Sequence, residues 1–164
     1  MKKTKQLTFI LALTFLFLFS GSSVVFGDDF EDGWDAYQKQ DYKTAHRLWL
    51  PLAEQGYAAA QLFLGVMYYK GRGVPQDYQE AVKWYRLSAE QGSAQSQYNL
   101  GLMYDFGQGV PQDYVSAHMW FNLCGSSSGN KICMDRRNIV EKKMSKQQIE
   151  KAQEMARNWK PTIK

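Results

Sequence analysis

The chain has 164 residues, of which 45% are hydrophobic, 15% aromatic and 22% charged, with a formal net charge of +4. This length and composition fit one globular domain or a short repeat array, and they exclude a disordered chain because enough apolar surface is present to form a core. Two cysteines exclude a disulfide-dense scaffold and the zinc sites that need several thiolates.

Residues 1–27 have the pattern of an export signal. Three early lysines precede an apolar run from Leu7 to Phe19, and small and polar residues with an acceptable cleavage pattern lead to Asp28. We therefore expect a bacterial signal peptide and a periplasmic or secreted protein. The alternative is an uncleaved membrane anchor, because residues 7–26 are just long enough to span a bilayer, and only then do we expect a membrane contact.

The sequence pI of about 9.0 is mostly a property of this segment. The segment holds three lysines and no acidic residue, so residues 28–164 carry 17 basic and 16 acidic side chains. Basicity therefore does not indicate a nucleic-acid partner, and we expect none. An asymmetry remains, because residues 28–130 hold 7 basic and 12 acidic groups, whereas residues 131–164 hold 10 and 4.

An internal repeat of 36 residues is the strongest signal in the chain. Residues 57–92, shifted by 36, match residues 93–128 at 16 positions, including Val-Pro-Gln-Asp-Tyr at 74–78 and 110–114. A fixed period of this length indicates stacked supersecondary units.

Each unit is predicted to be a helix, a tight loop and a second helix. The first helix, over about 58–70, carries a helical apolar stripe and ends at Gly71. Asp77 is predicted to cap the second helix, with Glu80 completing a capping box. Gly65 recurs as Gly101, which indicates two helix backbones in close approach, with the small Ala81 and its equivalent Ala117 on the partner helix.

The array is expected to extend in both directions. Residues 28–56 form a shortened N-terminal repeat, with a first helix near 28–39, and residues 129–164 form C-terminal capping helices near 131–143 and 146–158. Ser145 and Gln148 are predicted to form a capping box at the start of the last helix.

The repeat pattern resembles the SEL-one-like repeat family, a branch of the tetratricopeptide-like α/α solenoids. The residues that carry the resemblance are Leu64, Gly65, Tyr68, Gly71, Gly73, Val74, Pro75, Asp77, Tyr78, Ala81, Trp84, Tyr85, Gln91 and Gly92. The resemblance implies an all-α, α/α superhelical solenoid of about four hairpins. It also implies an adaptor or scaffold that binds a protein or peptide, in the cell envelope or outside the cell.

The family has no shared catalytic residues, so the resemblance implies neither an enzyme nor a cofactor. One cysteine-rich secreted group in the family is linked to penicillin binding and weak β-lactam hydrolysis. This leaves as the alternative a β-lactam- or peptidoglycan-binding envelope protein with weak β-lactamase-like activity.

Candidate binding residues are those that differ between the repeats while the frame stays fixed. By similarity to tetratricopeptide-like solenoids, the first helix of each unit lines a concave groove that would hold the partner. The residues chosen on this basis are Phe63, Val66, Tyr69, Lys70, Gln95, Asn99, Leu102, Asp105 and Phe106. The alternative is that some of them belong to the core between repeats.

Cys124 and Cys133 are nine residues apart, at the end of one predicted helix and the start of the next. We expect them to form a disulfide, because the export signal implies an oxidising compartment. The alternative is two small buried thiols.

No catalytic or metal-binding set is predicted. His46 and His118 occupy equivalent positions two units apart, too distant to share a metal, and are interpreted as helix-surface residues. Ser128 and Lys131 spell the serine-x-x-lysine pattern of penicillin-recognising enzymes, but the partner motifs are missing and the segment is interpreted as a turn.

The C-terminal segment is rich in basic residues. This basic stretch could bind anionic cell-wall material or an acidic partner, and the alternative is a solvated outer face. Its residues are Lys131, Arg136, Arg137, Lys142, Lys143, Lys146 and Lys151.

Overall fold

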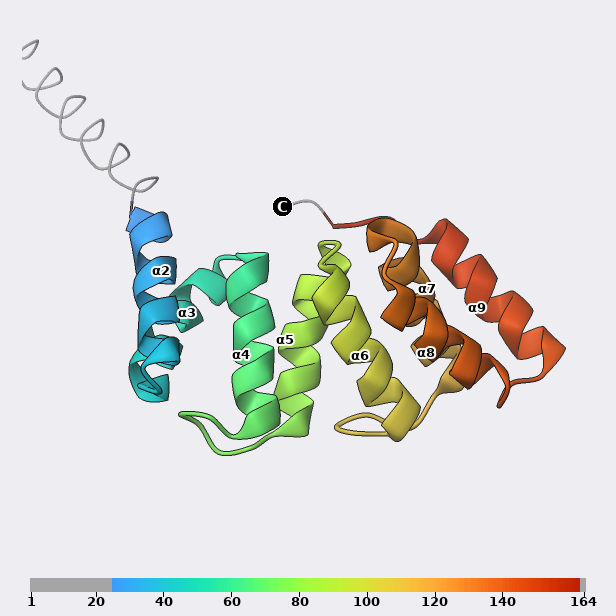
Figure 1. The fold of residues 1–164 in the computed structure, drawn as a ribbon, viewed down its shortest axis with the longest axis horizontal. Coiled ribbons are helices and arrows are strands. Elements are labelled where there is room, and N and C mark those ends of the chain that lie inside the picture. Colours follow the sequence, from blue (N-terminus) through green and yellow to red (C-terminus); the bar gives the residue numbers. More distant parts are fainter. Residues whose placement is uncertain (1–24, 163–164) are drawn as a thin grey trace, which may run out of the picture.

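The described part of the protein, residues 25–162 in a computed structural model, consists of eight α-helices without a strand (Figure 1). Most of the predicted export signal therefore lies outside the described residues. The helices are α2 (Val25–Gln38), α3 (Tyr42–Glu54), α4 (Ala58–Lys70), α5 (Tyr78–Glu90), α6 (Ala94–Phe106), α7 (Tyr114–Ser128), α8 (Lys131–Glu141) and α9 (Lys146–Asn158). None of these helices is long and apolar enough to cross a membrane.

From α2 to α8 each helix packs mainly on its neighbours in the chain, so these helices form a stack. The pairs α2–α3, α4–α5 and α6–α7 are hairpins, and α3–α4 and α5–α6 contacts join one hairpin to the next. Figure 1 shows the helices following one another along the long axis, from α2 at one end to α9 at the other. This arrangement confirms the predicted all-α repeat solenoid.

The last two helices do not continue the pattern of stacked hairpins. Helices α8 and α9 both pack on α7 rather than mainly on each other. Beyond α9 the chain turns back, and the backbone N–H of Thr162 donates a hydrogen bond to the carbonyl of Glu90 at 2.7 Å. The closing helices are thus held by the last full hairpin and by the end of α5.

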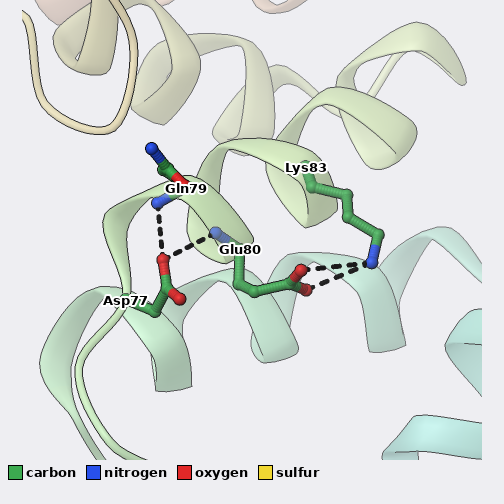
Figure 2. A network of polar contacts seen from close by, with 4 residues as sticks. All are labelled: Asp77, Gln79, Glu80 and Lys83. Atoms are coloured by element: carbon green, nitrogen blue, oxygen red, sulfur yellow. Dashed lines mark hydrogen bonds and ion pairs between the residues drawn. The ribbon is translucent and has the colours of Figure 1, made fainter.

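Aspartate side chains start the second helix of each hairpin. Oδ1 of Asp77 accepts hydrogen bonds from the backbone N–H groups of Gln79 and Glu80, at 2.8 and 3.1 Å, as predicted (Figure 2). The predicted capping box is wrong at this helix, because the Glu80 carboxylate pairs instead with Nζ of Lys83 at 3.2 Å. The predicted box of Ser145 and Gln148 is present at the start of α9.

An aromatic ring covers a glycine in each hairpin. A Cβ atom added to Gly65 would lie 2.5 Å from Cδ1 of Tyr85, and one added to Gly101 would lie 2.7 Å from Cε1 of Phe121. The prediction that Ala81 explains Gly65 is therefore wrong, because the group facing Gly65 is the Tyr85 ring. In the first hairpin the ring of Trp49 covers Gly33 in the same way.

The loop of each repeat rests on the preceding repeat. Gly73 has a φ of +74°, and a Cβ there would lie 2.6 Å from the carbonyl of Tyr42, the first residue of α3. Gly109 meets the carbonyl of Tyr78, the first residue of α5, in the same manner. Only glycine satisfies both this backbone conformation and this close approach.

Buried glutamines also join successive repeats. Nε2 of Gln61 donates to the carbonyl of Ala53 at 2.9 Å, and Nε2 of Gln97 donates to the carbonyl of Ala89 at 3.2 Å. Each glutamine lies in the first helix of a repeat and bonds a carbonyl at the end of the preceding hairpin. The repeat of Gln61 as Gln97 therefore reflects stacking of the units.

We expect Gly65→Ala to lower the free energy of unfolding by about 1–3 kcal/mol, which is typical of overpacking. Alanine normally favours a helix by about 1 kcal/mol over glycine, so the sign of the effect is diagnostic. The cause is the clash of the new methyl group with the Tyr85 ring. Urea unfolding followed by circular dichroism measures the change, and adding Tyr85→Leu should recover part of the loss. A variant as stable as the original chain would contradict the close contact.

Candidate functional site

A cavity of about 370 Å³ lies between α4 and α6, and we refer to it as the α4–α6 cavity. The structure brings seven of the nine predicted binding residues together there, and their role in binding stays a prediction. The residues lining the cavity are Leu62, Phe63, Val66, Tyr69, Lys70, Tyr85, Gln95, Asn99, Leu102 and Met103.

Three of the lining residues were missed by sequence reasoning. Leu62 and Met103 come from the apolar stripes of α4 and α6, and Tyr85 comes from α5, on the second helix of the hairpin. The signal that could have found Tyr85 is the 36-residue spacing of three aromatic residues, Trp49, Tyr85 and Phe121, each facing a glycine.

Tyr85 is only 3% exposed, yet its side chain lines the cavity. Burial is the main cause that raises the pKa of its hydroxyl, so the group is neutral near pH 7 and can donate a hydrogen bond. Within the described residues, its hydroxyl has no hydrogen-bond partner. The base of the cavity therefore combines an apolar ring with an unused polar group.

The polar side chains of the lining include Lys70 at the end of α4 and Gln95 and Asn99 in the first half of α6. Nε2 of Gln95 donates to Oδ1 of Asn99 at 3.3 Å, and the amide nitrogen of Asn99 makes no hydrogen bond to the described residues. The hydroxyl of Tyr69 donates a hydrogen bond to Oε1 of Gln108 at 3.4 Å. This bond links the end of α4 to the loop that follows α6.

Phe63 lines the cavity and also packs in the core. This agrees in part with the alternative that some of the predicted binding residues belong to the core between repeats. Its ring stacks on Trp49 with the centroids 4.8 Å apart and lies 5.2 Å from Trp34. On its other side Phe63 borders a shallower hollow with Phe30, Glu31 and Trp34. The aromatic surface thus continues from α4 to α2.

Two of the predicted binding residues do not line the α4–α6 cavity. Asp105 is 2% exposed, and its Oδ1 pairs with Nζ of Lys143 at 2.9 Å, so its prediction as a groove residue is wrong. The pair holds the turn after α8 against α6. Phe106 is 57% exposed at the end of α6 but lies outside the cavity lining.

The structure joins Cys124 and Cys133 by a disulfide, with Cα atoms 5.9 Å apart. The bond ties α7 to α8. Between these helices, Gly129 has a left-handed φ of +62°, and Asn130 accepts a hydrogen bond from the backbone N–H of Ile132 as the cap of α8. The serine-x-x-lysine segment therefore spans a helix boundary, with Ser128 ending α7 and Lys131 beginning α8.

The interpretation of His118 as a surface residue is wrong. His118 is 1% exposed, and its Nε2 lies 3.2 Å from Oε2 of Glu141 on α8. Burial lowers the pKa of His118, and the Glu141 carboxylate opposes this only in part. His46 is half-buried against Tyr68, and burial lowers its pKa as well. In the described part of the chain, no three His, Cys, Asp or Glu side chains are grouped so that they could hold a metal ion.

Part of the basic stretch serves the fold itself. Lys143 pairs with the buried Asp105, and Nη1 of Arg137 donates to Oδ1 of Asn122 on α7 at 3.1 Å. Nζ of Lys146 lies 3.8 Å from Oε1 of Glu150 in an exposed i,i+4 ion pair. Lys131, Lys142 and Lys151 are exposed.

These features define the class of protein: an α/α repeat solenoid with an open, mostly apolar cavity between the first helices of two successive repeats. A family model described as Sel1 repeat matches residues 30–57, 58–93 and 94–123. The chain belongs to the Sel1 repeat family, whose members are generally scaffolds for protein–protein interaction and bind protein partners.

Solved structures agree with this assignment. The chain is 31% identical to c5321, a protective antigen of uropathogenic Escherichia coli strains displaying an SLR fold, with a TM-score of 0.79 over 85% of this chain and 31% of that protein. It is 28% identical to a Sel1 repeat protein from Oxalobacter formigenes, with a TM-score of 0.65 over 77% of this chain and 54% of that protein. The chain thus spans no more than about half of either protein. No protein of curated function matches it.

We expect Lys143→Met to lower the free energy of unfolding by about 2 kcal/mol, because it leaves the buried carboxylate of Asp105 without its partner. The double variant Asp105→Asn/Lys143→Met should lose less free energy of unfolding than the sum of the losses in the two single variants. Urea unfolding of the four proteins gives this coupling. Strictly additive losses would show that the pair does not link α6 to the turn after α8.

The two histidines predict how stability depends on pH. Their pKa values in the folded protein lie below the ordinary 6.5, so the unfolded chain binds protons first as the pH falls. Stability is therefore full above about pH 6.5 and declines below it, by up to about 1.4 kcal/mol per pH unit for each group. We expect the melting temperature to fall between pH 7.5 and 5, and His118→Gln to reduce the slope of that fall. The quantity to compare is the change of melting temperature per pH unit, and not the melting temperature itself. The same change per pH unit in His118→Gln and in the original chain would contradict the prediction.

Proposed function

We propose that this Sel1 repeat protein is exported and acts as an adaptor that binds a partner protein in the α4–α6 cavity. The observation that carries the proposal is the cavity itself, which is open, mostly apolar and lined by positions at which the two repeats differ, such as Phe63 and its equivalent Asn99. A concave, apolar site with a few polar groups is the usual form of a binding site.

Two features support export. Residues 1–27 have the charge and hydropathy pattern of a signal peptide. The disulfide between Cys124 and Cys133 suits an oxidising compartment such as the periplasm or the cell exterior, because thiols are kept reduced in the cytosol.

Photo-crosslinking in the native cells tests the binding site. A photoreactive amino acid placed at Asn99 points from α6 into the cavity, and we expect it to give one defined crosslinked protein, identified by mass spectrometry. The same amino acid at Lys83 is the matched control. Lys83 is exposed on α5 (Figure 2). It precedes Tyr85 by two residues, so it lies on roughly the opposite side of that helix.

The two positions separate the outcomes. A product at Asn99 that is missing at Lys83 supports a partner in the cavity. The same product at both positions, or none at Asn99, would contradict the proposed site.

Mass measurement tests export separately. We expect the protein recovered from the cell envelope or the medium to begin at Asp28, after loss of residues 1–27. Recovery of the protein from the cytosol with residues 1–27 still attached would contradict export. The proposed binding site would then still be decided by the crosslinking test.

A further inference from the structure

We infer that the α4–α6 cavity is specific for a peptide segment in which a large apolar side chain is followed or preceded closely by a carboxylate. In this arrangement Lys70 binds the carboxylate, and the hydroxyl of Tyr85 donates a hydrogen bond to a peptide carbonyl beside the apolar side chain. This inference rests on the proposed function, because it names the chemistry of the partner at the same site.

The charges of the lining give the first argument. Lys70 is the one charged side chain among the lining residues, and the other polar groups are the amides of Gln95 and Asn99 and the hydroxyls of Tyr69 and Tyr85. Lys70 is exposed at the end of α4, and no carboxylate of the described residues lies within ion-pair distance of it. A cation without an acidic neighbour favours an anionic group on the partner.

The Tyr85 hydroxyl gives the second, independent argument. The three equivalent aromatic residues differ in their polar atoms: Nε1 of Trp49 donates to the carbonyl of Phe30 at 3.1 Å, and Phe121 has no polar side-chain atom. Tyr85 is 3% exposed and lines the cavity, and its hydroxyl makes no hydrogen bond to the described residues. A hydroxyl that faces an open cavity and has no partner in the protein is available to donate to an acceptor that a ligand supplies.

The size and the walls of the cavity define the rest of the ligand. About 370 Å³ lies at the small end of the range for ligand sites, roughly 300–1,000 Å³, and suits one large side chain with an adjoining peptide group. Leu62, Val66 and Met103 provide the apolar walls. The ring of Phe63 is held in place by its stacking on Trp49, so it offers a fixed surface for the side chain.

A random twelve-residue peptide library displayed on phage tests the inference with the purified protein. We expect the retained peptides to be enriched in Asp or Glu within three residues of Leu, Met, Phe or Trp. For one such peptide, synthesised and measured by calorimetry, we expect Lys70→Glu to weaken binding about tenfold or more, and Tyr85→Phe to weaken it about 2- to 10-fold.

The matched control is Lys151→Glu, which makes the same charge change on the exposed face of α9, away from the cavity. We expect it to leave affinity unchanged. A loss equal to that of Lys70→Glu would place the binding site on the basic C-terminal helices and overturn the inference. Circular dichroism of each variant confirms that the helices are intact.

The selection distinguishes failure of this inference from failure of the proposed function. Retained peptides without acidic enrichment, or the same peptides retained by Lys70→Glu, would overturn the inference while a peptide-binding adaptor still stands. Retention of no peptide by the original chain would count against both.

Discussion

The packing of an aromatic ring on a helix glycine is the contact on which each hairpin depends. Because Gly65 has no side chain, the Tyr85 ring lies directly on the backbone of α4, and the two helices approach closely. Phe121 on Gly101 repeats this contact in the next hairpin. The same ring that sets the distance between α4 and α5 also forms the base of the α4–α6 cavity, so the fold and the candidate site depend on one interaction.

The fold could be predicted from local signals. A 36-residue period, a glycine that ends each first helix and an aspartate that caps each second helix act over a few residues and are visible in one sequence. The partner of Gly65 could not be predicted in the same way. Both Ala81 and Tyr85 face α4 at helical spacing, and only the three-dimensional packing decides which side chain covers the glycine.

The candidate site was predicted in part, and the errors have a common cause. The prediction assumed that differences between repeats mark binding positions, but differences also arise from contacts that only the last repeat makes with the closing helices. Asp105 differs from its equivalent Tyr69 because it pairs with Lys143, 38 residues further along the chain. His118 is buried because α8 covers it and supplies Glu141. Neither partner lies within the repeat, so comparing the repeats could not reveal them.

The nesting of each loop on the preceding repeat has a mechanical consequence. At Gly73 and Gly109 one backbone touches another, with no side chain between them that could compress or change rotamer. These backbone contacts therefore help to set the spacing from one hairpin to the next, and with it the gap between α4 and α6. A partner that binds as proposed would meet a preformed opening, so the conformational entropy lost on association would be mainly that of the partner's own chain. Under that proposal, the cavity would favour partners whose binding segment already adopts a shape that fits it.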